Sequence, residues 1–165
     1  MKKINKINTI PEAILILPDI RSALNVGALF RTADAAGVSK VILTGCTPCP
    51  TDTFGRHQKD IAKSALGAET WIPWEYRKTV VPLIKKLKKE GCTIVALEQD
   101  ATAKDYRTIK TPSKVALIVG PEVDGLNEKI LNECDEIIEI PMHGKKESLN
   151  VSVATGIALF RLLHS

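Results

Sequence analysis

The sequence predicts an α/β fold in which a mainly parallel sheet is flanked by helices. Short runs that are apolar at nearly every position occur along the whole chain. Runs of this kind are typical of strands that are buried on both faces of a parallel sheet. Segments with helical periodicity separate the runs, and this alternation requires crossover connections that place helices on the sheet faces.

Six apolar runs are interpreted as strands because they are short and most are rich in β-branched residues. In chain order they are Ile14–Leu17, Lys40–Thr44, Thr70–Pro73, Thr93–Leu97, Val115–Val119 and Ile137–Ile140. Ligands of open parallel sheets bind beyond the carboxyl ends of the strands. The loops that follow these runs are therefore where we expect functional residues.

Four segments are interpreted as helices. Val26, Leu29, Ala33 and Ala36 fall on one helical face, and Gly37 suits the end of that helix. The other three helices are expected at Val80–Glu90, Asn127–Cys134 and Asn150–Leu163.

Length and composition indicate one folded domain. The chain has 165 residues, of which 44% are hydrophobic and 25% charged, values that support a buried core and exclude disorder of the whole chain. It contains no internal repeat and no Pro/Gly/Ser-rich linker. We therefore expect a single domain over residues 1–165.

The sequence gives no sign of a membrane or secretory segment. No apolar run approaches the roughly 18 residues that a membrane helix needs. The start, Met1–Lys6, is basic, but Pro18, Asp19 and Arg21 interrupt the apolar run that follows it. We expect a cytoplasmic protein with no membrane partner.

The charge distribution permits nucleic-acid binding. The formal net charge is +4, and clustering of the basic residues matters more than this total. The cluster within Lys85–Lys89 is interpreted as a solvated helix face. Two other clusters, Arg56-His57-Gln58-Lys59 and Lys145-Lys146, lie in predicted loops and are candidates for phosphate contacts.

Four cysteines do not form a recognisable metal or redox site. Cys46 and Cys49 have the spacing of a ligand pair, but Cys92 and Cys134 are isolated and supply no second pair. A structural zinc site normally needs four ligands. We therefore expect no metal and interpret the cysteines as loop and core thiols.

The first motif is Asn25-Val26-Gly27-Ala28-Leu29-Phe30-Arg31-Thr32-Ala33. We expect Asn25 and Gly27 at a strand-to-helix turn, where amide groups could hold an anion. Arg31 lies off the apolar face of the helix and could bind a phosphate through two hydrogen bonds. Without a ligand, Asn25 would be an N-cap, Gly27 a close-packing residue and Arg31 a surface cation.

The second motif, Gly120-Pro121-Glu122-Val123-Asp124-Gly125, leaves a strand through two glycines. Glycine permits close backbone approach to a ligand. The motif matches neither the P-loop nor the dinucleotide fingerprint. Glu122 could neutralise a cationic ligand, orient a neighbour or cap the following helix.

The third motif runs from Ile140-Pro141-Met142 to Ser148-Leu149-Asn150-Val151-Ser152. Ser148 and Asn150 are both good N-caps for the final helix. Two such residues after a loop long enough to enclose a ligand are more than capping requires.

In order and spacing these three motifs resemble the signature motifs of the SpoU (TrmH-type) family of SPOUT methyltransferases, and the resemblance covers essentially the whole chain. The segment Lys63-Ser64-Ala65-Leu66-Gly67-Ala68-Glu69 also looks like that family. The resemblance implies an alpha/beta knot fold, in which the C-terminal segment forms a trefoil knot. It further implies S-adenosylmethionine as cofactor, held mostly by backbone groups of Leu97, Gly120, Ile140 and Leu149.

The reaction implied by the resemblance is methylation of a ribose 2′-hydroxyl in tRNA or rRNA. Arg31 then has the central role, with Asn25, Glu122, Ser148 and Asn150 around it. Because a guanidinium is essentially never neutral in proteins, we expect Arg31 to bind the adjacent phosphate and stabilise the developing alkoxide. Contacts to RNA are expected from a basic set: Arg31, Arg56, His57, Lys59, Lys145 and Lys146.

Both the resemblance and the sequence point to a homodimer. The final helix is apolar almost all round, with Val153, Ile157 and Phe160 among its residues, and such a helix requires burial on more than one side. Since about ten residues precede the first strand, we expect no separate N-terminal RNA-binding domain.

Three alternatives remain open at this point. One is a catalytically silent knotted RNA-binding protein, and another is a SPOUT enzyme that methylates a base. The third is a nucleotide- or NAD-binding oxidoreductase, but the chain lacks the glycine fingerprint and the acidic residue expected about 20 positions later.

Overall fold

The computed structural model describes residues 10–164. The basic start Met1–Lys6 lies outside the described residues, so the expectation about a secretory signal stays a prediction. In residues 10–164 no helix is both long and apolar enough to span a bilayer.

The described part of the chain forms a seven-stranded sheet with the order β3-β2-β1-β6-β4-β7-β5, and every neighbouring pair of strands is parallel. The strands are β1 (Glu12–Pro18), β2 (Lys40–Thr44), β3 (Trp74–Arg77), β4 (Thr93–Leu97), β5 (Lys104–Asp105), β6 (Lys114–Val119) and β7 (Glu136–Glu139). The helices are α1 (Ala23–Ala36), α2 (Lys59–Ala65), α3 (Ala68–Trp71), α4 (Val80–Lys89), α5 (Glu128–Leu131) and α6 (Val151–Leu163), with the 3-10 helix η1 at Tyr106–Thr108.

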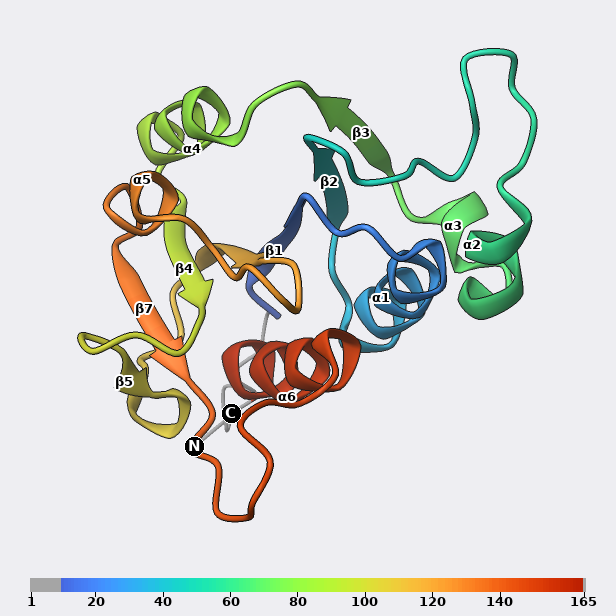
Figure 1. Ribbon diagram of the computed structural model, residues 1–165. Helices are drawn as coiled ribbons and strands as arrows, with labels where there is room; N and C mark the ends of the chain where they lie inside the picture. Colours follow the sequence, from blue (N-terminus) through green and yellow to red (C-terminus); the bar gives the residue numbers. More distant parts are fainter. Residues whose placement is uncertain (1–9, 165) are drawn as a thin grey trace, which may run out of the picture.

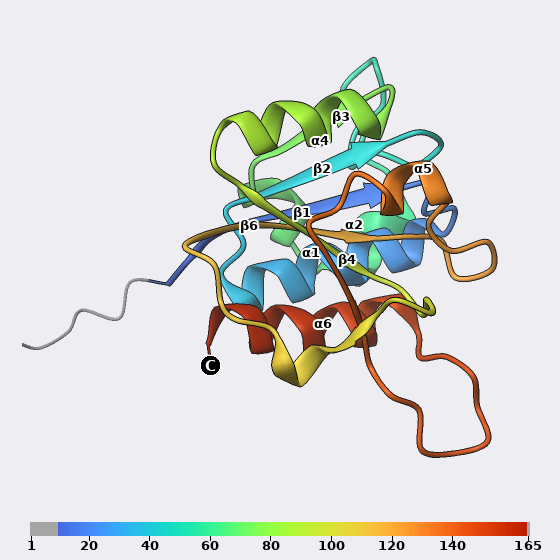
Figure 2. The ribbon, with the colours of Figure 1, turned by 90° about the vertical axis from the view of Figure 1, so that its left-hand side faces the viewer.

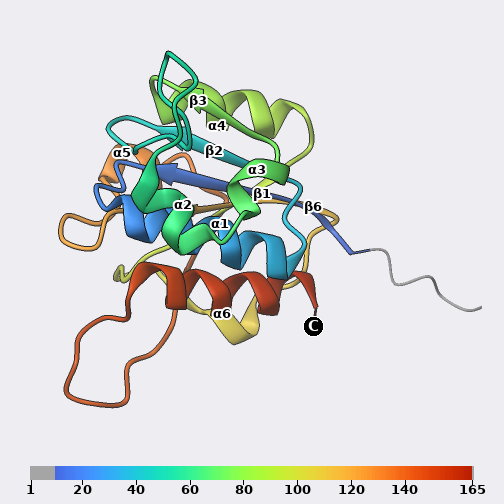
Figure 3. The same ribbon diagram turned by 90° about the vertical axis from the view of Figure 1, so that its right-hand side faces the viewer.

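Helices cover both faces of this sheet (Figure 1). Helices α4 and α5 lie on one face, and α6 and α1 lie on the other, as the side view also shows (Figure 2). Helix α2 packs beside α1 on that second face (Figure 3). The predicted class, a parallel sheet flanked by helices, is confirmed. The trefoil knot stays a prediction.

Along the inner strands, buried apolar side chains point alternately to the two faces of the sheet, so each face packs against its own hydrophobic core. In β1, Leu15 and Leu17 pack with α1 and α6, whereas Ile14 and Ile16 pack with α4. Successive side chains of a strand point to opposite faces. A strand with helices on both sides must therefore be apolar at every position, which is the pattern that marked β1, β2, β4 and β6 in the sequence.

The predicted strand at Thr70–Pro73 is wrong. Residues Ala68–Trp71 form the short helix α3, and the strand β3 begins afterwards, at Trp74. The Thr70 hydroxyl donates a hydrogen bond to the carbonyl of Gly67 at 2.7 Å, and the Ile72 amide donates to the carbonyl of Ala68 at 3.0 Å. These local bonds satisfy the backbone within a turn. Strand β3 is a polar edge strand, so it lacks the apolar run that marks an inner strand.

The observed helix ends agree closely with those predicted from the sequence. Gly37 ends α1 with a φ of 84°, as predicted, and Asn150 is the N-cap of α6. Helix α5 begins after Asn127 as expected but ends at Leu131, which is earlier than the predicted Cys134. Helix α2 and strand β5 were not predicted, because the first is short and the second is a polar pair of residues.

Candidate active site

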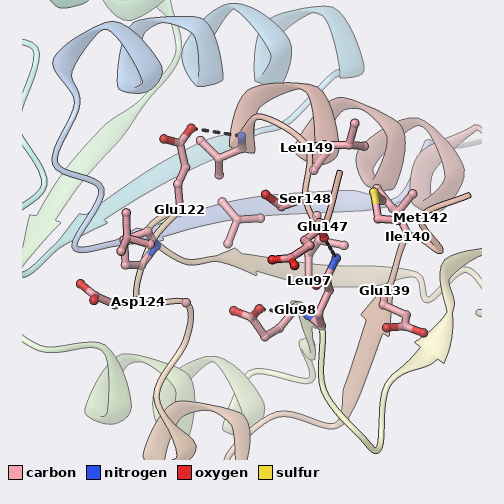
Figure 4. Close-up of a pocket in the computed structure, with 17 residues that line it drawn as sticks. Leu97, Glu98, Glu122, Asp124, Glu139, Ile140, Met142, Glu147, Ser148 and Leu149 are labelled. Atoms are coloured by element: carbon pink, nitrogen blue, oxygen red, sulfur yellow. Dashed lines mark hydrogen bonds between the residues drawn. The ribbon is translucent and has the colours of Figure 1, made fainter. Parts of the chain in front are cut away.

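Three parallel strands end at the same edge of the sheet and enclose a cavity. Strands β6, β4 and β7 are neighbours in the order β6-β4-β7, and they end at Val119, Leu97 and Glu139. The loops that leave these strands surround a cavity of about 380 Å³ (Figure 4). This is the edge at which open α/β sheets bind ligands.

Part of the cavity wall is apolar. Leu97, Ile140 and Leu149, three of the four residues expected to contact the cofactor, line it. The fourth, Gly120, does not line the cavity itself, although its neighbours Val119 and Pro121 do. A Cβ atom at Gly120 would lie 2.9 Å from two side-chain carbons of Leu126. Glycine is therefore needed here for the packing of its own turn.

The rest of the wall is acidic. Within the described residues the lining contains no lysine, arginine or histidine, and it contains five carboxylates: Glu98, Glu122, Asp124, Glu139 and Glu147. Asp124 is paired with Arg21 at 3.0 Å. An acidic, partly apolar cavity favours an organic cation over an anion such as a nucleotide phosphate.

The first motif begins inside a helix and not at the predicted turn. Ser22 is the N-cap of α1, and its hydroxyl accepts a hydrogen bond from the Asn25 amide at 3.2 Å. The interpretation of Asn25 as an N-cap is therefore wrong, and its side chain is free for another contact. Gly27 lies in the helix, where a Cβ would be 2.1 Å from Ser64 Oγ and 2.3 Å from the Ile61 carbonyl oxygen. Gly27 is thus a close-packing residue between α1 and α2.

Glu122 joins the three motifs. Its Oε1 accepts hydrogen bonds from Asn25 Nδ2 at 2.9 Å and from Asn150 Nδ2 at 3.2 Å. The same oxygen lies 3.4 Å from the Val151 amide, the first residue of α6. Glu122 therefore caps α6 and orients both asparagines, whereas α5, the helix that follows it in sequence, is capped by Asn127.

The orientation of Asn150 follows from its role as a cap. Its Oδ1 accepts hydrogen bonds from the amide and the hydroxyl of Ser152, at 2.9 and 2.6 Å. Its Nδ2 therefore faces away from the helix, toward Glu122 and the Oδ1 of Asn25, the latter at 3.2 Å. Ser148 also lines the cavity, on the wall opposite Glu98 (Figure 4).

Arg31 is not brought to this cavity within one chain. It lines a separate groove between α1, α2 and α6, together with Lys63, Val153 and Phe160. Arg31 comes six positions after Asn25, so the two side chains point in directions about 120° apart around the helix and start about 9 Å apart along it. Among residues 10–164, no hydrogen-bond or ion-pair partner of Arg31 is found.

A sequence model of the SpoU rRNA Methylase family matches residues 12–160 of the chain. The chain belongs to this family. Its relatives include the 23S rRNA (guanosine-2'-O-)-methyltransferases RlmB of Xanthomonas axonopodis pv. citri and Escherichia coli K12, which are 35% and 37% identical over 147 residues. Each match covers 89% of this chain but only 56% and 58% of the relative. The chain therefore spans a little over half the length of these relatives.

Solved structures of SpoU methyltransferases share the fold. The AdoMet-bound rRNA methyltransferase of Sinorhizobium meliloti matches with a TM-score of 0.81 at 34% identity, over 94% of this chain and 57% of its own. The TrmH/SpoU tRNA modifying enzyme of A. aeolicus matches with a TM-score of 0.79 at 28% identity, over 92% of this chain and 73% of its own.

Apart from Arg31, the expected RNA contacts of this SpoU chain lie on two exposed segments. Arg56 is paired with Asp52 at 2.7 Å and lies 5.3 Å from the centre of the Phe54 ring. The pKa of Asp52 is lowered chiefly by the hydrogen bond that the Arg56 backbone amide donates to it, and also by the hydrogen bond from the Arg56 side chain. His57 follows on the same segment, whereas Lys59 is the first residue of α2 and not part of the predicted loop. Lys145 and Lys146 lie in the loop between β7 and α6, which projects from the body of the molecule (Figure 2).

Sequence reasoning missed Glu98 and Gln99, which line the cavity directly after β4. Their position at the carboxyl end of a predicted inner strand was the available signal. The cysteines do not join the site: Cys46 and Cys49 are free thiols, and residues 10–164 contain no group of three or more His, Cys, Asp or Glu residues arranged to hold a metal ion.

Proposed function

We propose that this chain transfers a methyl group from S-adenosylmethionine to a ribose 2′-hydroxyl of RNA, with ribosomal RNA as the favoured substrate. The observation that carries the proposal is the contact of Glu122 with Asn25 and Asn150, one residue from each motif, at an acidic cavity. The names of the RlmB relatives support the ribose 2′-hydroxyl as the methyl acceptor and ribosomal RNA as the substrate. A ribosomal RNA substrate also implies a cytoplasmic location, which is part of the same proposal.

The cavity fits the cofactor by size and by chemistry. Its volume of about 380 Å³ lies within the usual range of small-molecule sites. Leu97, Ile140 and Leu149 would hold the adenosine part against the apolar wall, and the carboxylates would face the positively charged part. When bound, S-adenosylmethionine supplies a methyl group on a sulfonium, ready for attack by an oxygen nucleophile.

The residues around Glu122 would align the substrate. Glu122 keeps both asparagines in fixed orientations, and Ser148 presents its hydroxyl at the cavity wall. Alignment of the ribose hydroxyl with the methyl group is the main requirement of a direct transfer. Arg31 is always protonated, so its role would be to bind the adjacent phosphate and to stabilise the developing negative charge on the ribose oxygen.

A homodimer would complete this site. The groove that contains Arg31 exposes 51% of Val153 and 48% of Phe160 on α6. An isologous contact through this face would bury these side chains and bring Arg31 of one protomer close to the other. Light scattering tests the dimer directly, because a monomeric mass at micromolar concentration would rule it out.

Transfer of labelled methyl groups tests the activity. The protein is incubated with labelled S-adenosylmethionine and ribosomal RNA or tRNA that lacks ribose methylation, and the product is digested with alkali. We expect label in alkali-resistant dinucleotides of ribosomal RNA, since a 2′-O-methyl group blocks cleavage at its own 3′ phosphate. Label on a base would indicate a base methyltransferase. Binding of RNA without any transfer would indicate a silent RNA-binding protein.

A further inference from the structure

Two adjacent residues connect the loops that enclose the cavity. Residues 120–126, which follow β6, form a turn that contains two glycines and is called the glycine turn below. Glu98 Oε2 accepts a hydrogen bond from the amide of Leu126, in this turn, at 2.7 Å. Gln99 Nε2 donates a hydrogen bond to the carbonyl of Glu147, in the loop after β7, at 2.5 Å. Glu98, Gln99 and Glu147 all line the cavity (Figure 4). One short segment after β4 therefore holds both of the other walls.

The backbone of this segment is fixed by the sheet. The amide of Glu98 donates to the carbonyl of Ile138 at 3.0 Å, which continues the pairing of Leu97 with Ile138 between β4 and β7. The second carboxylate oxygen, Oε1, accepts from the amide of Gln99 at 2.9 Å. Both oxygens of Glu98 are thus held by backbone donors, and a carboxylate accepts such bonds more strongly than a neutral group does.

The glycine turn is packed directly against the Glu98 carboxylate. Gly125 has a φ of 65°, and its amide donates to the carbonyl of Pro121 at 3.0 Å, which closes the turn. A Cβ atom at Gly125 would lie 2.7 Å from Glu98 Oε2. The carboxylate occupies the space that a side chain at Gly125 would need. The turn that carries Glu122 is therefore shaped around Glu98.

We propose that Glu98 and Gln99 are positioning residues, which hold the glycine turn and the loop after β7 in the arrangement that binds S-adenosylmethionine. The inference rests on the proposed function and names two residues outside its three motifs. Neither residue needs to touch the reacting atoms. Loops around a binding site are precise only when a rigid element supports them, and here the end of β4 is that element.

Glu98→Gln tests the contact with the turn. Glutamine has the same size, but one of its two terminal atoms is an NH₂ donor, which must face either Leu126 N–H or Gln99 N–H. We expect faster hydrogen exchange at the Leu126 amide without any ligand, and an affinity for S-adenosylhomocysteine, measured by calorimetry, that is about tenfold weaker. The KM for S-adenosylmethionine should rise by a similar factor of about ten, whereas kcat at saturation falls less than about threefold.

Two further variants separate position from charge. Glu139→Gln removes another carboxylate from the cavity lining. Among residues 10–164 no backbone amide donates to the Glu139 side chain, so the loss of affinity should be smaller than that of Glu98→Gln. Gln99→Glu replaces the donor that faces the Glu147 carbonyl, so affinity should fall while exchange at Leu126 stays unchanged. Equal losses in Glu98→Gln and Glu139→Gln would mean that charge alone matters, which overturns the inference.

Binding of S-adenosylhomocysteine by the wild-type protein distinguishes failure of the proposed function from failure of the role proposed for Glu98. Failure of the wild-type protein to bind S-adenosylhomocysteine would contradict the proposed function. Normal binding by the wild type together with unchanged affinity and unchanged Leu126 exchange in Glu98→Gln would contradict only the role of Glu98.

Discussion

The Asn25 side-chain amide donates a hydrogen bond to the Glu122 carboxylate at 2.9 Å across 97 positions of sequence. Asn25 lies in the first turns of α1, and Glu122 lies in the turn after β6. Because β6 lies beside β1 in the sheet, the loops that leave these two strands meet at one edge. The pairing of two central strands thus brings the first motif to the second.

Replacing Asn25 with Asp should impair methyl transfer strongly. The change replaces an amide donor with a second carboxylate beside Glu122, so a hydrogen bond becomes a repulsion. Loss of a hydrogen bond to a charged group costs about 1.5–3 kcal/mol, which corresponds to a rate roughly 10 to 100 times lower. Single-turnover methylation measures the effect. Asn25→Ala, which removes the bond without adding charge, should lose less, and equal rates for Asn25→Asp and the wild type would contradict the role of this contact.

Replacing Gly27 with Ala should destabilise the fold. The new Cβ would lie 2.3 Å from the backbone carbonyl oxygen of Ile61, so α1 and α2 must move apart. Overpacking of this kind costs about 1–3 kcal/mol, and urea denaturation measures it. Gly144→Ala is the matched control, since a Cβ there meets nothing within 4 Å, and its effect should stay within about 0.5 kcal/mol.

Cys46 should be far more reactive than Cys92 and Cys134. Burial raises the pKa of Cys92 and of Cys134 to about 11, so at pH 8 almost none of either thiol is present as the reactive thiolate. Cys46 is exposed. A thiol reagent at pH 8 should modify Cys46 in the native protein and reach Cys92 and Cys134 only on unfolding, as peptide mass spectrometry would report. Rapid native modification of Cys92 would show that this part of the core opens.

Mixed dimers should test whether Arg31 acts across protomers. Arg31→Ala and Glu122→Gln should each reduce methyl transfer when present in both protomers. If Arg31 serves the pocket of the other protomer, a dimer with one variant of each kind has one intact site, and mixing the two proteins should restore part of the activity. Absence of any recovery, with exchange of protomers shown by native mass spectrometry, would place Arg31 in its own chain's site.

Arg31→Lys separates charge from geometry at the same position. Lysine keeps the positive charge but cannot bind a phosphate through two parallel hydrogen bonds. We expect the rate of methyl transfer at saturating cofactor to fall at least about tenfold, because one charge-assisted hydrogen bond to the phosphate is lost. Turnover close to that of the wild type would exclude the bidentate role.

The sequence was informative where one local pattern determined one element. Inner strands such as Val115–Val119 are apolar on both faces, so they could be recognised. Helix α4 could be recognised because it is amphipathic and is followed closely by Gly91. Strand β3 was misplaced because an edge strand with Glu75 and Arg77 carries no such pattern. The same limit applies to the site. The three motifs contain Asn25, Glu122 and Asn150, which the structure brings into contact. The direction of Arg31, away from the cavity, depends on helix rotation and on the neighbours of α1.

The strand order also constrains how the protein is made. The sheet inserts β6 between β1 and β4, so the amino-terminal half of the chain obtains its central neighbour only after residue 119 has been synthesised. Contacts between such distant positions form slowly because a long loop must close first. Glu122 then acquires its last partners from the beginning of α6. A nascent chain on the ribosome therefore remains unable to assemble the site until the final helix has emerged.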